Sequence, residues 1–323
     1  MNDESWFEVE VAVKELEADG VVRLELADRE GRELPEFTAG AHIDVEVTPG
    51  ITRQYSLCNS PRERHRYVIG VLREPSSRGG SQAVHDTIQA GHTIRIGTPR
   101  NHFALDPTAS RYILFAGGIG VTPILAMAEH LSGSGKPFEL HYCVRTVARA
   151  AFVRRMAQSP FSAHVHLHRD DGPPEQRLEI GQALGSSADN AHVYVCGPAP
   201  FIGYVLEGAR ALGWPEARLH REFFAATTSS PASADGSFEV ELRGTGQVLT
   251  VPADRSIVEV LSEAGVAVEV SCEQGVCGTC LTRVLQGEPD HRDVFLTDAE
   301  HLRNDRMTIC CSRSKSARLV LDL

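Results

Sequence analysis

The sequence lacks the long apolar segment that a membrane-spanning helix requires. No uninterrupted apolar stretch of about 18 residues occurs in the chain. The first ten residues, MNDESWFEVE, contain neither the basic n-region nor the apolar h-region of a secretory signal peptide. These absences predict a soluble, cytoplasmic protein without membrane association.

Basic residues are too few for a general affinity for phosphate backbones. The chain has 32 Lys plus Arg against 43 Asp plus Glu, a formal charge of −11. Because nucleic-acid binding depends on clustered Lys and Arg, nucleic acid is not expected as a partner. No internal repeat is seen. With 42% hydrophobic and 23% charged residues, disordered and fibrous classes are excluded, and 323 residues suggest two or three domains.

The chain divides into three parts that differ in their pattern of apolar and polar residues. Up to about residue 105, short alternating stretches separated by polar turns predict an antiparallel barrel or sandwich, for example at 21–26, 42–47 and 67–72. Residues 111–222 alternate apolar strands with helix-like segments, which predicts a parallel sheet with crossover helices. The strands expected there are 112–116, 139–144, 164–168 and 192–196.

The third part follows a stretch that has almost no large apolar side chains. Residues 225–237, AATTSSPASADGS, have the composition of a flexible linker. Beyond it we expect strands at 238–242, 247–251 and 318–323 and a helix at 257–264. The predicted boundaries are therefore 1–108, 109–224, 225–237 and 238–323.

Five of the eight cysteines crowd into the last 52 residues. Cys272, Cys277 and Cys280 are spaced C-x4-C-x2-C, and Cys310 follows after 29 intervening residues. This is the spacing of a plant-type [2Fe–2S] site. A structural zinc site, which favours paired C-x2-C knuckles, and buried free thiols are the alternatives. The spacing alone leaves Cys310 and Cys311 open as the fourth ligand.

Two glycines within this segment have a physical role. Gly275 and Gly278 allow a tight bend around an inorganic core and leave amide N–H groups free to point at sulfur.

A glycine-rich loop, GGIGVTPI at 117–124, follows the strand at 112–116 and precedes a helix-like segment at 125–131. Gly118 and Gly120 would let a pyrophosphate approach the backbone at a helix N-terminus. A plain strand–turn–helix is the alternative, because such turns are common.

A second loop, Cys196-Gly197-Pro198, ends the strand at 192–196, where ligands bind in open α/β sheets. Cys196 taken alone is more often a small core residue. Arg145 and Arg149 are either solvated charges or contacts for a nucleotide ribose or phosphate.

Two barrel segments suit a flat, anionic cofactor. Arg53, Tyr55 and Leu57 alternate, so they would project from one side of a strand. Residues 76–81, SSRGGS, precede a helix expected at 82–88 with Ser81 as its cap, where a terminal phosphate would dock beside Arg78. An ordinary strand and a polar loop are the alternative.

The order of RQYSL, SSRGGS, GGIGVTPI, CGP, EFF and CEQGVCGTC resembles that of the phthalate dioxygenase reductase family over essentially the whole chain. The resemblance implies an antiparallel β-barrel flavin domain, an α/β parallel-sheet nucleotide domain of the ferredoxin reductase type and a C-terminal β-grasp ferredoxin domain. The implied cofactors are FMN, a [2Fe–2S] cluster and NADH, although Arg145 and Arg149 would also suit the 2′-phosphate of NADPH.

The resemblance also implies residue roles. The implied flavin contacts are Arg53, Tyr55, Ser56, Gly80, Ser81, Thr122 and Phe224, and the loop pattern itself adds Arg78. The nucleotide contacts expected from the loop patterns are Gly118, Gly120, Arg145, Cys196 and Gly197. Ser56, Cys196 and Glu222 would position hydride transfer, and the metal ligands would be Cys272, Cys277, Cys280 and Cys310. The segment His291-Arg292-Asp293 fits the family, whereas Phe201 replaces a common aliphatic residue or Met.

These parts form a logical sequence of carriers. NADH gives up two electrons as a hydride, a [2Fe–2S] cluster accepts one at a time, and a flavin bridges the mismatch. By resemblance, the acceptor would be the terminal Rieske non-haem iron oxygenase of a mono- or dioxygenase or demethylase system. A zinc- or redox-sensing regulator and a reductase for a cytochrome P450 are the alternatives. His164, His166 and His168 are interpreted as a solvated face of one strand, not as iron ligands.

Overall fold

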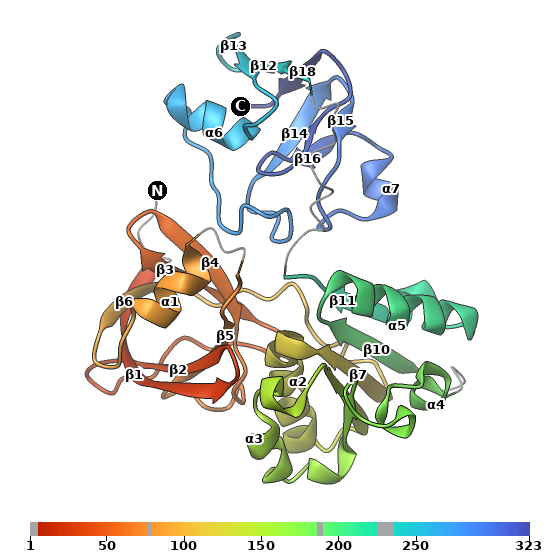
Figure 1. The fold of residues 1–323 in the computed structure, drawn as a ribbon. Helices are drawn as coiled ribbons and strands as arrows, with labels where there is room; N and C mark the ends of the chain where they lie inside the picture. Colours follow the sequence, from red (N-terminus) through yellow and green to blue (C-terminus); the bar gives the residue numbers. More distant parts are fainter. Residues whose placement is uncertain (1–5, 76–78, 186–189, 225–235) are drawn as a thin grey trace. The chain divides into compact units, whose positions relative to one another are not determined.

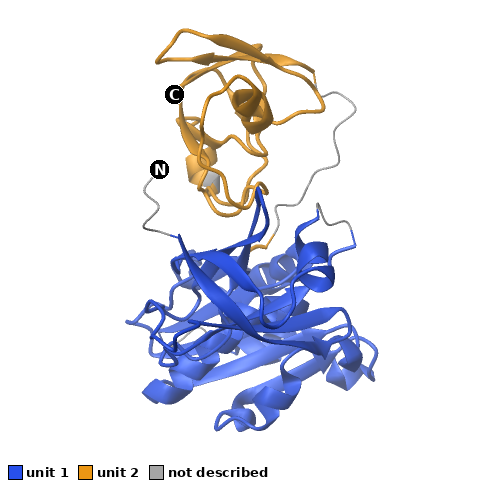
Figure 2. Cartoon of the chain, turned by 90° about the vertical axis from the view of Figure 1, so that its left-hand side faces the viewer, with its two compact units in different colours: residues 1–222 blue, residues 223–323 orange. Residues whose placement is uncertain are grey.

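The computed structural model describes residues 6–75, 79–185, 190–224 and 236–323. The chain forms two compact units, residues 1–222 and residues 223–323 (Figure 2). Unit 1 contains two sheets, and unit 2 contains a third sheet and a short two-stranded ribbon (Figure 1).

The first sheet is an antiparallel barrel with strand order β4-β3-β6-β1-β2-β5. Its strands are β1 (Trp6–Ala18), β2 (Val21–Ala27), β3 (His42–Thr48), β4 (Ile51–Ser56), β5 (Tyr67–Leu72) and β6 (Thr93–Gly97). A bridge between Leu57 and Ile69 joins the two edges. Alternate side chains of β2 are buried, as the sequence pattern predicts. Helix α1 (Gly80–Asp86) packs near β3, β4 and β5.

The second sheet is wholly parallel, with strand order β11-β10-β7-β8-β9. Its strands are β7 (Arg111–Gly117), β8 (Phe138–Val144), β9 (Val165–Arg169), β10 (Ala191–Cys196) and β11 (Leu219–Glu222). The helices are α2 (Val121–Ser134), α3 (Val153–Ala157), α4 (Ile180–Leu184) and α5 (Ala199–Ala211). The strand order reverses between β7 and β10, and the carboxyl ends of neighbouring strands at such a reversal form the usual ligand crevice.

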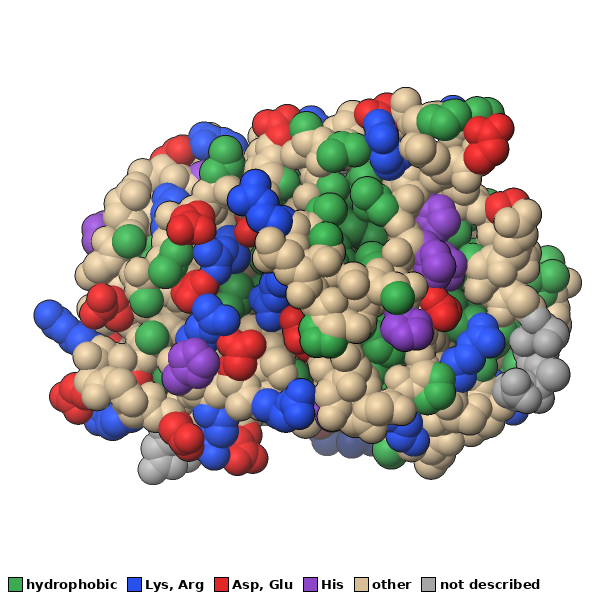
Figure 3. All heavy atoms as spheres, turned by 90° about the horizontal axis from the view of Figure 1, so that it is seen from below, with side chains coloured by type: hydrophobic (Ala, Val, Ile, Leu, Met, Phe, Trp, Pro, Cys, Tyr) green, Lys and Arg blue, Asp and Glu red, His purple; other side chains and the backbone are tan. Residues whose placement is uncertain are grey.

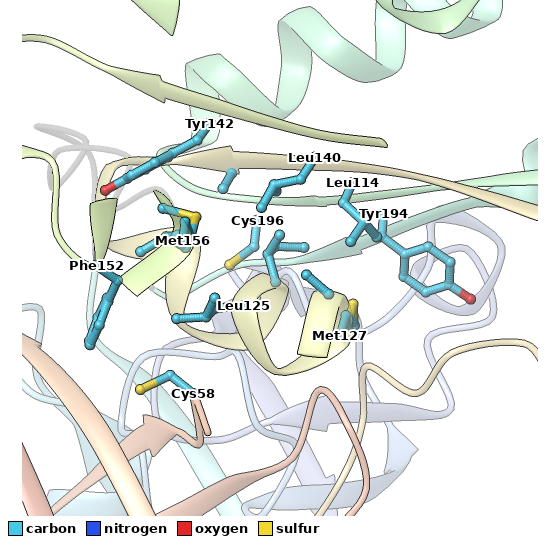
Figure 4. Packing of buried hydrophobic residues seen from close by; sticks show 14 of the residues in the cluster. Cys58, Leu114, Leu125, Met127, Leu140, Tyr142, Phe152, Met156, Tyr194 and Cys196 are labelled. Carbon is cyan, nitrogen blue, oxygen red and sulfur yellow. The ribbon is translucent and has the colours of Figure 1, made fainter. Parts of the chain in front are cut away.

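The barrel and the parallel sheet share one hydrophobic core. Cys58 and Val68 of the barrel belong to the same buried cluster as Leu125 of α2 and Cys196 of β10, several of which are visible in Figure 4. Each large apolar side chain buried there contributes about 1.5–3 kcal/mol. Shared burial explains why the two sheets form one compact unit.

Unit 2 has the strand order β13-β12-β18-β14-β16, with β12 and β18 parallel. Its strands are β12 (Phe238–Leu242), β13 (Val248–Val251), β14 (Leu281–Gln286), β15 (Pro289–Asp290), β16 (Arg306–Thr308), β17 (Arg313–Ser314) and β18 (Arg318–Leu321). Its helices are α6 (Ile257–Glu263) and α7 (Asp298–His301). Ser256 and Glu259 form a reciprocal capping box that starts α6.

Three local predictions are wrong. Gly79 (φ +87°), not Ser81, precedes the first turn of α1, because its left-handed backbone starts the helix two residues earlier than expected. Ser81 accepts a hydrogen bond from the Glu74 N–H instead (3.1 Å). His164 lies in a turn before β9, not on the strand. His168 is partly buried and not simply solvated, because its Nε2 lies 3.0 Å from Nδ1 of the buried His141.

Among the described residues, no helix combines the length and the apolar character needed to cross a bilayer. On the face shown in Figure 3, acidic and basic side chains are interspersed, not segregated. Surface ion pairs such as Arg66–Glu63 (2.8 Å) are consistent with this mixture and add little stability individually.

Candidate functional site

The two predicted nucleotide loops lie side by side at the reversal of the parallel sheet. Ala116 of β7 is paired with Cys196 of β10, so the loops that follow leave the same sheet edge. A Cβ at Gly120 would collide with the Cys196 carbonyl and lie 2.7 Å from the Gly197 nitrogen. Only glycine therefore permits this approach.

Gly118 has a different role. Its φ of +54° lies in the left-handed region, and a Cβ there would meet no atom of the described residues within 4 Å. The backbone at Gly118 is thus open to an approaching ligand, as the pyrophosphate prediction requires.

The Glu222 carboxyl group lies beside Cys196 and has an unsatisfied oxygen. The two residues are paired across β10 and β11. Although Glu222 as a residue is only partly buried, its Oε2 is fully covered and makes no hydrogen bond in the described part of the chain. Burial raises the pKa of Glu222 to about 8. Burial, and then the nearby Glu222, raise the pKa of Cys196 well above its usual value.

Phe201 fills the space behind the two loops, a role that the sequence did not reveal. Methyl groups at Gly117 and Gly197 would lie 2.7 Å and 2.9 Å from Phe201 Cδ1. The aromatic ring that departs from the family pattern therefore packs directly against both loops. The only sequence feature that could have indicated this packing is the pair of glycines, Gly117 and Gly197, which leave room for a large side chain.

Thr122, expected near the flavin ring, lies where the nucleotide sheet meets the barrel. A Cβ at Gly70 of β5 would be 3.0 Å from Thr122 Cγ2. Thr122 is buried and its hydroxyl donates to the Ile119 carbonyl (3.0 Å). The first turn of α2 thus contacts the barrel strand directly.

Arg53 and Gly80, two predicted flavin contacts, are brought together. A Cβ at Gly80 would lie 2.6 Å from both Cγ and Nε of Arg53. Burial raises the pKa of the neighbouring Tyr55, and Ser56 at the end of β4 is buried. Arg53 of β4 can pack this closely on α1 only because Gly80 has no side chain. A guanidinium held beside the backbone at the start of a helix fits a bound anion.

The structure places the remaining predicted cofactor contacts on the surface or does not describe them. Arg145 and Arg149 are exposed beyond β8, and Phe224 is also exposed. Arg78 lies outside the described residues. Their roles stay predictions.

In unit 2, the four predicted metal-binding thiols converge. The Cys272 thiol lies within hydrogen-bonding reach of Cys277 and Cys310, and Cys310 also reaches Cys280. The shared hydrogen bonds lower the pKa of Cys272 and Cys280 and raise that of Cys277 and Cys310. Four cysteine sulfurs within reach of one another form a donor set that fits a sulfur-ligated cluster.

Cys310 and Cys311 face different surroundings. Cys311 contacts Thr308 Oγ1 (3.3 Å), and its Sγ would lie 2.5 Å from a Cβ at Gly275. Cys311 therefore lies behind the loop, while Cys310 lies with the other thiols.

The loop around the thiols has the expected backbone. Gly275 and Gly278 have φ of +69° and +72°. The N–H groups of Gln274 and Thr279 point at the sulfurs of Cys272 (3.3 Å) and Cys277 (3.4 Å). Such N–H···S contacts stabilise negative charge on sulfur.

Comparison with known proteins agrees with this geometry. Residues 240–315 match the model of the 2Fe-2S iron-sulfur cluster binding domain. The chain is 52% identical to a vanillate O-demethylase oxidoreductase of Pseudomonas sp. strain HR199, covering 98% of this chain and 99% of the relative. The solved structure of a phthalate dioxygenase reductase is 40% identical, with a TM-score of 0.80 and 99% of each chain covered. An intact type IV self-sufficient cytochrome P450 monooxygenase is 36% identical, with a TM-score of 0.81, over 98% of this chain and 41% of that one.

The site and fold thus define an oxidoreductase with a flavin barrel, a pyridine-nucleotide domain and a ferredoxin domain. The chain belongs to the phthalate dioxygenase reductase family. Its cofactors are FMN, a [2Fe–2S] cluster and NADH, and it transfers electrons from NADH to an oxygenase component.

Proposed function

We propose that the oxygenase served by this chain is a Rieske non-haem iron oxygenase, and that the pair works in the cytoplasm. The observation that supports this most directly is the convergence of Cys272, Cys277, Cys280 and Cys310 in a chain that also carries a nucleotide crevice. The relatives matched along nearly their whole length include a vanillate O-demethylase oxidoreductase, and residues 240–315 of this chain match a 2Fe-2S cluster binding domain.

The barrel residues would hold FMN by its anionic end. Arg53 and Gly80 would contact the phosphate, with Ser81 and Arg78 completing the set, while Tyr55, Ser56, Thr122 and Phe224 would contact the ring and ribityl chain. The tight packing of Arg53 on Gly80 supports this assignment. Bound FMN supplies the conversion of an electron pair into single electrons.

The crevice residues would orient the coenzyme. Gly118 leaves its backbone open to the pyrophosphate, whereas Gly120 and Gly197 allow the two loops to pack closely. Arg145 would contact the ribose or phosphate. Glu222 Oε2, which is buried and has no hydrogen-bond partner among the described residues, would accept a hydrogen bond from a carboxamide N–H. Cys196 and Ser56 would shape the position of the nicotinamide by contact. These roles make Glu222 and Cys196 positioning candidates for hydride transfer.

A cytochrome P450 is the second candidate acceptor. The similarity to the type IV self-sufficient P450 monooxygenase, over 98% of this chain, is the specific observation that favours it. It is the weaker proposal, because this chain covers only 41% of that protein but 99% of the vanillate O-demethylase oxidoreductase.

Anaerobic rapid mixing distinguishes the two acceptors. The NADH-reduced chain is mixed with a purified Rieske non-haem iron oxygenase and, separately, with a cytochrome P450. We expect bleaching of the Rieske absorption at a rate that rises with oxygenase concentration, and no matching reduction of the haem. Fast haem reduction with an unreduced Rieske centre would reject the proposal.

A further inference from the structure

The aromatic ring of Phe201 lies at the junction of the two nucleotide loops. Phe201 belongs to the first turn of α5, which directly follows the loop that contains Gly197 and Pro198. The N–H groups of Phe201 and Ile202 both donate to the Pro198 carbonyl (2.9 and 3.0 Å), and Ile202 is fully buried. The backbone that carries the ring is therefore fixed to the second loop.

The ring fits into the space that two missing side chains leave. Its Cδ1 atom lies 2.7 Å from the Cβ position of Gly117 and 2.9 Å from that of Gly197. The Cβ position of Gly197 also lies 2.9 Å from the Gly117 Cα. The ring and the two loop backbones are thus in mutual contact.

Gly117 shows that this space is reserved for the ring. Its φ of −110° and ψ of 111° are extended values that any residue adopts, so the backbone itself does not require glycine there. Outside the adjacent residues, the three described atoms nearest to a Cβ at Gly117 would all belong to Phe201. Glycine at position 117 is therefore needed because of the aromatic side chain at position 201.

The loops need a rigid neighbour because glycine is flexible. Positions 117, 118, 120 and 197 are all glycine, and glycine loses more conformational freedom on ordering than any other residue. A ligand that had to order both loops would bind more weakly, whereas loops that are already held in place bind at a lower entropic cost. The ring of Phe201 supplies such a rigid surface to both loops.

We propose that Phe201 is a positioning residue for the coenzyme. Its ring holds the loops that contain Gly117 and Gly197 in the arrangement that binds the pyrophosphate of NADH. This inference rests on the proposed assignment of the crevice to the coenzyme. The ring acts on the affinity for the coenzyme and not on the hydride transfer step.

Binding of ADP-ribose to the full chain, with FMN and cluster in place, tests the proposal. ADP-ribose carries the pyrophosphate but no nicotinamide, so it reports on the loops without a contact to the reacting ring. Isothermal titration should find the affinity about tenfold lower in Phe201→Ala. Phe201→Leu, which keeps Cδ carbons beside the glycines, should stay within about threefold of the wild type. The FMN and iron contents show whether each variant is folded.

The matched control is Tyr204→Ala. Tyr204 is a second aromatic residue of α5, but it is exposed and its hydroxyl donates to the Leu178 carbonyl (3.3 Å). This variant should bind ADP-ribose as the wild type does. Equal losses in Phe201→Ala and Tyr204→Ala would overturn the proposal, because the effect would then not depend on the loop contact.

A double-mutant cycle tests the contact itself. Gly117→Ala should weaken ADP-ribose binding about tenfold when Phe201 is present, since the new Cβ meets the ring, but less than about threefold in the Phe201→Ala background. Effects of the two substitutions that simply add would overturn the proposal.

Rapid mixing with NADH gives a readout that a general loss of stability does not predict. In Phe201→Ala, the NADH concentration at half-saturation should rise about tenfold, while the saturating rate of FMN reduction stays within about twofold of the wild type. Normal ADP-ribose binding with a lower saturating rate would overturn the proposal, since the ring would then act on the nicotinamide directly.

Gly120→Ala separates a failure of this inference from a failure of the proposed function. If Gly120→Ala weakens ADP-ribose binding and Phe201→Ala does not, the crevice still binds the coenzyme and the role of Phe201 is rejected. If neither substitution weakens binding, the coenzyme does not use this crevice, and both proposals are rejected.

Discussion

At the scale of single residues, the buried carboxyl group of Glu222 makes stability depend on pH. Its pKa of about 8 in the folded chain lies above the ordinary value of 4.5. The folded state therefore holds a proton that the unfolded chain releases. The resulting stabilisation is complete below about pH 4.5 and is lost as the pH rises through about 8.

Glu222→Gln should remove this dependence. Between about pH 5.5 and 8.5, we expect the free energy of unfolding to fall by about 1–2 kcal/mol more in the wild type than in the variant, since partial exposure of the residue reduces the full effect. Urea unfolding at the two pH values measures the difference. Parallel pH profiles for the two proteins would show that the carboxyl group is not held protonated by the fold.

The adjacent cysteines Cys310 and Cys311 should differ sharply on substitution. Cys310 lies with Cys272 and Cys280, whereas Cys311 contacts Thr308. Cys310→Ser should therefore lose most of the roughly two irons per chain, while Cys311→Ser should keep nearly all of them. Iron analysis and the visible spectrum decide the matter, and the reverse pattern would make Cys311 the ligand.

At the scale of elements, the approach of the two nucleotide loops depends on Gly120. A Cβ there would lie 2.7 Å from the Gly197 nitrogen, and neither loop backbone has room to yield. Gly120→Ala should cost about 1–3 kcal/mol of unfolding free energy and raise the KM for NADH by about tenfold or more.

The matched control is Gly203→Ala in α5, where a Cβ would have no neighbour within 4 Å in the part of the chain that the structure describes. It should leave the KM unchanged and stabilise the chain by up to about 1 kcal/mol. Equal kinetic effects of the two substitutions would argue against a specific contact between the loops.

Elements with strong periodic patterns were predictable, and short ones were not. Strand β12 occupies the predicted residues 238–242, and α6 ends one residue before the predicted 264. Strand β11, Leu219–Glu222, has two charged residues and one histidine in four positions, so no apolar run marked it. The start of α1 was missed because a left-handed Gly79, not a side-chain cap, determines it.

The same distinction applies to the site. Cysteine spacing predicted three ligands and a distant fourth, because a cluster imposes its own geometry, and the family resemblance selected Cys310, 39 positions from Cys272 when both ends are counted. Family resemblance named Cys196 and Glu222, but their pairing depends on the order of the strands in the sheet, which no local pattern indicates.

At the scale of the whole molecule, charge is unevenly distributed. From Phe238 to the C-terminus the chain has 14 acidic and 9 basic residues, so 14 − 9 gives −5 of the total −11 in about a quarter of the length. We predict an acidic docking face on the ferredoxin domain. Association with the oxygenase should slow several-fold between about 0.05 and 0.5 M salt. Rates independent of ionic strength would count against electrostatic docking.

The central claim is that electrons reach the oxygenase only through the iron–sulfur cluster. Cys277→Ala tests it most directly, with two acceptors measured on the same preparation. We expect the rate of NADH-driven reduction of the oxygenase to fall by about a hundredfold or more. Ferricyanide is small enough to react directly at the flavin, so its rate of reduction should stay within about twofold of the wild type. Undiminished reduction of the oxygenase by the Cys277→Ala chain would contradict the account.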